Sequence, residues 1–448
     1  MRNILVLGAG LSSSALIKYL LDHSQEEDWN VTVADFSSDA AKAKTKNHPR
    51  SKAVSLDVKN ESQRAEEIKR ADIIISLLPP GLHFLAAMDC IRFKKNLITA
   101  SYVSDQIKKL ENDAVNGGIL LLNEMGLDPG IDHMSAMQII HFLKSENAEL
   151  LSFKSYTGGL VAPEFNDNPW GYKFTWNPRN VILAGQGTAK FIRDGKYRYI
   201  PYSRLFKQIE IIEVEGLGIF DGYANRDSLA YRYHYDIENI PTLLRGTLRN
   251  HGFCEAWNVF IQLGLTDDSF VIENAVELTY SQFVEAFIPT TIEGKDLKSK
   301  VAAFYDVEAD GEVMKKIEWT GIFDDVKINL ENVTPAQILQ DLLQRKWVLK
   351  QGDKDMIIMQ HEFIFRGQKA EDGGQKKKII SSLVVKGDNA EFTAMAKTVG
   401  LPMGIAAKLI LNGKIKLTGV KIPVMKEIYE PVLSELKSLG IIFSEKHN

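Results

Sequence analysis

The chain has 448 residues, of which 45% are hydrophobic and 25% charged, and its formal net charge is −4. This length favours two or three domains, and the charge excludes the basic surface typical of nucleic-acid or membrane binding. Because Cys90 and Cys254 stand alone and no apolar run reaches about 20 residues, we expect a cytoplasmic protein without disulfides, metal or membrane span.

The chain begins with an apolar strand, a glycine turn and a helical pattern in NILVLGAGLSSSALIKYLL. Gly8 permits a tight turn and Gly10 lets the backbone approach a pyrophosphate, to which the following helix offers free N–H groups. The third glycine of this fingerprint is replaced by Ser13, whose hydroxyl could add a donor. The predicted cofactor contacts in this stretch are Gly8, Gly10, Leu11, Ser12 and Ser13.

A second strand, WNVTVADF, ends in Asp35, at the spacing where an acid meets a ribose 2′-hydroxyl. A carboxylate there would repel a 2′-phosphate, so the sequence favours NAD, with NADP as the alternative cofactor. A glycine turn followed by an acidic strand end also occurs without a ligand, and the argument for a dinucleotide site rests on both features together.

Four more apolar runs, SKAVSLDV, ADIIISLLPP, KNLITASYV and GGILLLNEMG, alternate with helical or loop segments. Six strands in this rhythm predict an α/β fold with a doubly wound parallel sheet of the Rossmann type. Ligands of such sheets lie beyond the carboxyl ends of the strands. The candidate residues at those ends are Leu78, Pro79, Ser101, Tyr102 and the segment from Glu124 to Asp128.

The stretch NEMGLDPGIDH follows the sixth strand and is unusually polar. LDPG is typical of a turn, and IDHMSAMQIIHFLKS predicts a helix with Asp132 as its N-cap. His133 is then structural, whereas Asp128 is a candidate ligand contact. We interpret this stretch as a hinge between two domains.

The rhythm changes near residue 148, which predicts an α+β domain over 133–392 with a helical insertion near 178–210. Within it we expect strands at AELLSFKSYTGGLVAPEF, 300–323 and KKKIISSLVVKGD, a helix over 242–265, and an exposed hairpin loop at the charge run 369–378. Two C-terminal helical segments, within 393–448, are expected to pack on the first domain, 1–132.

Two clusters in this domain are rich in arginine, YANRDS and LLRGTLR. Arginines in a cleft bind carboxylates bidentately, although arginines on a helix are more often solvated or paired.

Ten segments together resemble the glutamate-forming saccharopine dehydrogenases: LGAG, DIIISLLP, TASYVS, NEMGLDPGIDH, YTGGLVAPE, DNPWGYKFTW, NRDS, RGTLR, GLPMGIAAKLIL and KEIYEPVLSELK. The resemblance implies a Rossmann domain completed by the C-terminal segment, and an α+β substrate and dimerisation domain with a small helical insertion. It implies a homodimer that converts saccharopine, NAD(P)+ and water to L-glutamate and 2-aminoadipate 6-semialdehyde. Because the chain starts with the first Rossmann strand, we expect a stand-alone enzyme.

The resemblance also implies residue roles. The substrate-binding positions are Ser101, Tyr102, Asp128, Arg226, Thr247, Leu248 and Arg249, and the cofactor positions include Leu127 and Trp176. Fungal NADP-dependent members carry a basic residue near the position of Asp35, which puts NADP use in doubt. Tyr102 and Asp128 are the candidate catalytic bases, and the sequence does not rank them.

Two other functions stay open. A related amine dehydrogenase acting on lysine or a polyamine conjugate would need fewer carboxylate anchors. A non-catalytic dinucleotide-binding regulator would need only the cofactor contacts.

Overall fold

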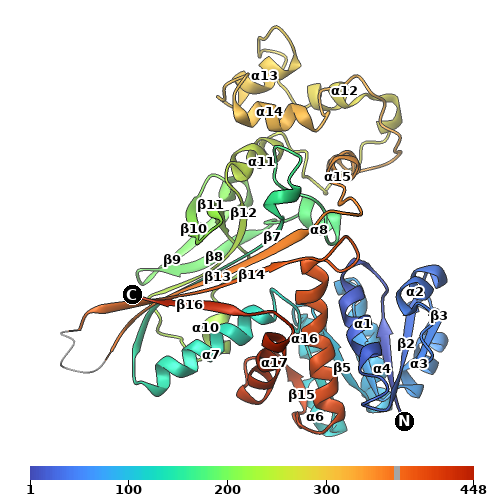
Figure 1. The fold of residues 1–448 in the computed structure, drawn as a ribbon. Coiled ribbons are helices and arrows are strands. Elements are labelled where there is room, and N and C mark those ends of the chain that lie inside the picture. The colour runs from blue at the N-terminus through green and yellow to red at the C-terminus, as the bar shows by residue number, and fades with distance from the viewer. Residues whose placement is uncertain (368–373) are drawn as a thin grey trace. The chain divides into compact units, whose positions relative to one another are not determined.

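The computed structural model describes residues 1–367 and 374–448, so the first half of the loop predicted at 369–378 lies outside the described residues. The chain forms two compact units (Figure 1). Unit 1 comprises Met1–Leu150, His234–Asp236 and Phe365–Asn448, and unit 2 comprises Leu151–Tyr233 and Ile237–Ile364. The first boundary therefore lies near residue 150, whereas the sequence had suggested 132.

Unit 1 is built on a seven-stranded sheet with the order β15-β6-β5-β4-β1-β2-β3, in which every pair is parallel. Its strands are β1 (Arg2–Leu7), β2 (Trp29–Asp35), β3 (Ser51–Ser55), β4 (Ile73–Ser76), β5 (Asn96–Thr99), β6 (Leu120–Leu122) and β15 (Gly419–Lys421). The six predicted strands and the Rossmann-type fold are confirmed, and a C-terminal strand adds a seventh. The order reverses between β1 and β4, which is where ligands of doubly wound sheets bind.

The helices of unit 1 are η1 (Leu11–Ser13), α1 (Ser14–Asp22), α2 (Ser38–Thr45), α3 (Glu61–Arg70), η2 (Pro80–Leu82), α4 (His83–Phe93), α5 (Asp105–Lys108), α6 (Glu111–Gly117), α7 (Ile131–Ser145), α16 (Ala394–Leu411) and α17 (Lys426–Ser438). Most of them connect these parallel strands, whereas α7, α16 and α17 do not. An antiparallel pair, β14 (Lys376–Lys386) and β16 (Phe443–His447), completes the unit.

The C-terminal helix α16 packs against α1 (Figure 1), as the sequence predicted for the end of the chain. The approach is close, because a Cβ placed on Gly400 would lie 2.8 Å from the backbone nitrogen of Leu16. By length and composition α16 could cross a membrane, but 67% of it is buried inside the protein, as in a core helix of a globular domain.

Unit 2 is an α+β body with a mixed sheet. Neighbouring strands run in the order β10-β11-β12-β7-β13, with β12 parallel to β7 and antiparallel to β11. The strands are β7 (Glu149–Val161), β8 (Thr188–Arg193), β9 (Lys196–Pro201), β10 (Ile209–Val214), β11 (Gly218–Ala224), β12 (Thr242–Asn250) and β13 (Asp355–Arg366). The helices are η3 (Pro163–Phe165), α8 (Pro178–Ile182), α9 (Tyr202–Leu205), α10 (Tyr231–His234), α11 (Phe253–Gln262), η4 (Ala275–Glu277), α12 (Tyr280–Glu285), α13 (Leu297–Phe304), α14 (Glu312–Trp319) and α15 (Pro335–Lys346).

Three predictions for this unit were wrong. The stretch 178–210 is mainly the β8–β9 hairpin, flanked by single-turn helices, and the larger helical segment lies after residue 253. Residues 242–250 form the central strand β12 instead of a helix, because the chain passes Tyr156 so closely that a Cβ on Gly246 would lie 2.4 Å from its ring. Residues 300–323 are largely helical, with Val313 and Ile317 on one buried face.

The α1–α16 contact generates a stability prediction. Alanine is the better helix former by about 1 kcal/mol, yet Gly400→Ala should destabilise the protein by about 1–3 kcal/mol, since its methyl group meets backbone. Thermal melting measures this. Gly117→Ala is the matched control, because its nearest neighbour would be an ordinary 3.9 Å away. Equal melting temperatures for Gly400→Ala and the wild type would contradict the close packing.

Candidate functional site

The glycine turn of unit 1 has the geometry of a phosphate-binding loop. Gly8 has φ +105°, and a Cβ there would lie 3.1 Å from the carbonyl oxygen of Leu77, whereas the space above Gly10 is open. Ser13 is buried and its hydroxyl donates to the Gly10 carbonyl at 2.8 Å, so it braces the turn and its hydrogen is not offered to a ligand. The open backbone at Gly10 is what the approach of a pyrophosphate requires.

Asp35 lies at the carboxyl end of β2, as predicted. One carboxylate oxygen accepts the N–H of Ala9 at 2.8 Å, and the other accepts the N–H of Ser37 at 2.9 Å. The acid therefore connects the glycine turn to the start of α2, and it stands beside the position expected for a ribose.

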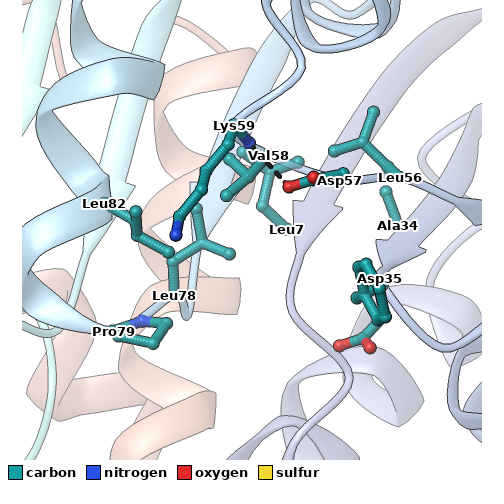
Figure 2. A pocket seen from close by; sticks show the side chains of 11 residues that line it. Leu7, Ala34, Asp35, Leu56, Asp57, Val58, Lys59, Leu78, Pro79 and Leu82 are labelled. Carbon is teal, nitrogen blue, oxygen red and sulfur yellow. Dashed lines mark hydrogen bonds between the residues drawn. The ribbon is translucent and has the colours of Figure 1, made fainter.

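A cavity of about 380 Å³ opens next to Asp35 (Figure 2). It is lined by Leu7, Ala34, Asp35, Phe36, Leu56, Asp57, Val58, Lys59, Leu78, Pro79 and Leu82. The lining is mostly apolar, and the loop after β3 is held by the backbone N–H of Lys59, which donates to Asp57 at 2.9 Å. An apolar slot beside a ribose-binding acid fits a purine ring, so the glycine turn, Asp35 and this cavity fit the adenosine half of a dinucleotide.

The sequence analysis found Leu78 and Pro79 but missed Phe36 and the loop from Leu56 to Lys59. The rule that ligands lie beyond the carboxyl ends of parallel strands applies equally to β3, and it would have found this loop. Phe36, which is 80% exposed, directly follows Asp35.

Ser101 and Tyr102 follow β5, and Asp128 follows β6, so the parallel sheet brings them to one edge. The Tyr102 hydroxyl donates to Asp128 at 3.4 Å. Ser101 lies 2.8 Å from the Nε2 of His83, a buried residue that the sequence analysis missed. Leu127, predicted to contact the cofactor, is also buried here.

The polar stretch NEMGLDPGIDH lies entirely in unit 1. Several of its polar side chains form hydrogen bonds with other groups of that unit. Glu124 accepts the Val103 N–H at 3.1 Å and contacts Nε2 of His133 at 2.8 Å, while His133 Nδ1 lies 2.6 Å from the Tyr235 hydroxyl. Helix α7 starts at Ile131 with Gly130 as N-cap, so the predicted Asp132 cap was wrong by two positions. Its carboxylate instead accepts the Gly130 N–H at 2.6 Å.

In unit 2, Arg249 is the most distinctive of the predicted residues. It is only 5% exposed, and its guanidinium stands over the rings of Tyr172, Phe253 and Tyr223 at 5.3, 5.5 and 6.0 Å. Within the described part of the chain it forms no ion pair, and its hydrogen bond goes to the Leu248 carbonyl at 3.0 Å. Burial raises the pKa of both tyrosines, so this aromatic box offers no anion.

The strand partner of Arg249 explains why no carboxylate neutralises it. Asp221 lies opposite Arg249 in the β11–β12 ladder. Its carboxylate accepts the backbone N–H groups of Gly252 and Cys254 at 3.0 and 3.1 Å, and so serves the start of α11. A buried charge without a partner is costly, which makes Arg249 a candidate for contact with an anionic ligand.

The other predicted residues of unit 2 lie on β12, just after β11 and just before α8. Arg226 is exposed, has φ +45°, and lies two residues beyond the end of β11, whereas Arg249 pairs with Asp221 in the middle of that strand. It is therefore not beside Arg249. Thr247 lies opposite Tyr223 in the β11–β12 ladder, and Trp176 is half-buried against the core. Leu248 is fully buried and its side chain packs beside Gly158, and its predicted substrate contact stays a prediction.

His83 generates a pH prediction. Burial lowers its pKa from 6.5 to about 4, so between these values the unfolded chain binds a proton that the folded chain does not. Stability should therefore fall as the pH drops, by about 2 kcal/mol between pH 7 and pH 5. The free energy of unfolding of His83→Gln, measured with urea, should lack this part of the pH dependence. An identical pH slope in both proteins would contradict the burial of a neutral imidazole.

Comparisons with known proteins agree on one family. The saccharopine dehydrogenase NADP binding domain matches residues 4–122, and the saccharopine dehydrogenase C-terminal domain matches residues 126–441. The chain is 34% identical to saccharopine dehydrogenase (NADP(+), L-glutamate-forming) of Saccharomyces cerevisiae, over 99% of both chains. It is 37% identical to the mitochondrial alpha-aminoadipic semialdehyde synthase of Bos taurus, over 99% of this chain and 47% of that protein.

The chain thus spans about half the length of its mammalian relatives. A solved structure of histidine-tagged saccharopine dehydrogenase (L-Glu forming) from Saccharomyces cerevisiae covers 100% of both chains with a TM-score of 0.88 and 31% identity. The family resemblance noted from the motifs is confirmed: the chain belongs to the saccharopine dehydrogenase family.

Proposed function

We propose that this chain oxidises saccharopine with a nicotinamide dinucleotide and water, giving L-glutamate and 2-aminoadipate 6-semialdehyde. Support comes from the yeast relative of equal length, whose name specifies formation of L-glutamate. The observation that carries the proposal is Arg249, a buried cation that no acid of the described chain neutralises. Saccharopine has three carboxylates, the groups that a guanidinium binds bidentately.

The anchors proposed for the substrate differ in setting. Arg249 would bind one carboxylate inside its aromatic box, where low polarity strengthens the ion pair. Arg226, which lies beyond the end of β11, would bind a carboxylate at the other end of this long substrate. Two distant anchors fix the orientation of the reacting carbon, and such positioning lowers the barrier.

A bound nicotinamide ring supplies the hydride acceptor for the reaction. The secondary amine of the substrate must lose its proton before the neighbouring C–H bond can break. We assign this proton to the carboxylate of Asp128, since a neutral phenol cannot take it, and Tyr102 holds that carboxylate through its 3.4 Å hydrogen bond. Water adds to the resulting C=N bond, and cleavage of the C–N bond releases both products.

One assay separates this function from its alternatives. Reduced nicotinamide should appear with saccharopine and not with lysine or without an amine, and glutamate should be the product. Turnover with lysine would favour the amine dehydrogenase, and no turnover at all would favour the regulator. The homodimer and the cytoplasmic location stay predictions.

Replacing Arg249 should affect the KM for saccharopine and the folding stability in different ways. Arg249→Met should raise the KM for saccharopine about 100-fold, because a charge-assisted contact is lost. Stability should be unchanged or higher, since an unpaired buried charge is replaced by a side chain of similar size. Steady-state kinetics and urea unfolding measure the two effects.

Lys173→Met is the matched control in the same unit. Lys173 is buried but pairs with Asp353 at 2.6 Å and Asp167 at 2.8 Å, so its loss should destabilise the protein and leave the KM unchanged. An unaltered KM in Arg249→Met would contradict the role of Arg249 as a carboxylate anchor.

For the cofactor, the family establishes a dinucleotide, and the choice between its two forms is our proposal. The fungal relatives are named for NADP(+), so the comparisons do not support the preference for NAD. The argument for NAD is the carboxylate of Asp35, which is held against the glycine turn where a 2′-phosphate would have to lie.

We therefore predict that the wild type has a kcat/KM for NAD about 10-fold or more above that for NADP. Asp35→Ala should narrow this ratio. The ratio of the two kcat/KM values is measured because Asp35 also holds the glycine turn, so its loss should weaken the binding of both cofactors. Asp39→Ala removes an equal but fully exposed charge on α2 and should leave the ratio unchanged. A wild type that prefers NADP would overturn the proposed selectivity.

A further inference from the structure

A buried imidazole links two strand ends of unit 1. His83, at the start of α4, is 2% exposed. Its Nδ1 lies 2.8 Å from the hydroxyl of Ser76 at the end of β4, and its Nε2 lies 2.8 Å from the hydroxyl of Ser101 after β5. Thr99 lies against the same ring at 3.3 and 3.4 Å. His83 has no place in the reaction described so far.

The ring is neutral, so only one of its nitrogens carries a hydrogen. The hydrogen bonds can therefore run from Ser76 to His83 to Ser101, or in the opposite direction. The Ser76 side chain is fully buried, and among the described residues its hydroxyl contacts His83 alone. In the opposite direction Nδ1–H would donate to Ser76, and the Ser76 hydroxyl hydrogen would have no acceptor, which costs about 1–3 kcal/mol.

The first direction is therefore the stable one. The Ser76 hydroxyl donates to Nδ1, and Nε2–H donates to the Ser101 oxygen. Ser101 then keeps its own hydrogen for an outside acceptor. In the reverse direction that hydrogen would be spent on His83, and Ser101 could offer only lone pairs.

We infer that His83 is a positioning residue whose Nε2–H tautomer, fixed by Ser76, makes Ser101 a hydrogen-bond donor to a carboxylate of the bound substrate. The tautomer follows from unit 1 alone, whereas the identity of the acceptor rests on the proposed function. A carboxylate can only accept hydrogen bonds, so it needs the direction that the buried Ser76 enforces.

Nitrogen-15 NMR of the protein labelled at histidine tests the tautomer without any substrate. The signals of His83, assigned by their loss in His83→Gln, should show a protonated Nε2 and an unprotonated Nδ1 at neutral pH. Ser76→Ala should shift the ring towards a mixture of tautomers. A protonated Nδ1 in the wild type would overturn the inference, whether or not the protein oxidises saccharopine.

A double-mutant cycle tests whether His83 acts through Ser101. His83→Gln and Ser101→Ala should each lower kcat/KM for saccharopine about 10-fold, and the double variant should be no worse than Ser101→Ala. His141→Gln is the control, because it removes a comparable 2.7 Å contact to Tyr429 and should leave the kinetics unchanged. Additive losses would show that His83 acts independently of Ser101 and would overturn its positioning role. Failure of the wild type to turn over saccharopine would instead refute the proposed function.

Discussion

Parallel strands end at a common edge, and every polar group that the chain places there must find a partner or a ligand. Unit 1 meets this constraint with three sets of contacts. Asp35 accepts N–H groups from the glycine turn and from the start of α2, His83 links Ser76 to Ser101, and Glu124 contacts His133. These contacts make the edge rigid before any ligand binds, which is the condition for positioning a substrate to within a few tenths of an ångström.

In unit 2, by contrast, no acid of the described chain neutralises the buried guanidinium of Arg249. Asp221, the acid closest to Arg249 in the ladder, is committed to the start of α11, and the remaining neighbours of the guanidinium are neutral rings. The cost of this unpaired charge is carried by the folded protein and would be recovered on binding of the proposed anionic substrate. The folded protein would thus be less stable without a ligand but would bind an anion more tightly, a trade-off that is common at binding sites.

Much of unit 1 could be predicted because its signals are local. Strands buried on both faces, such as β4 and β6, are apolar runs with short connections, and the glycine turn and Asp35 lie within one β–α–β segment. His83 could not be found in this way, because a single histidine at a helix start has no local signature. Its partners lie 7 and 18 residues away and meet only when β4 and β5 pair.

The predictions for unit 2 failed where local pattern and tertiary environment disagree. The pattern of TLLRGTLR is compatible with a helix as well as with a strand. It forms β12 because the ring of Tyr156 packs closely against Gly246 in the sheet. The residues 300–323 were misread because short helices with few apolar positions resemble alternating strands. The sequence singled out Arg226 and Arg249, whose roles as substrate anchors stay predictions, but their separation in the fold could only come from the register of β11 and β12.

The packing of α16 on α1 has a consequence for how the protein is made. Helix α1 follows the glycine turn, yet the helix that covers α1 begins only at Ala394, after all of unit 2. On the ribosome, the apolar face of α1 around Leu16 therefore waits uncovered while unit 2 is synthesised and folds. The cofactor-binding unit, although it starts first, is the last to be completed.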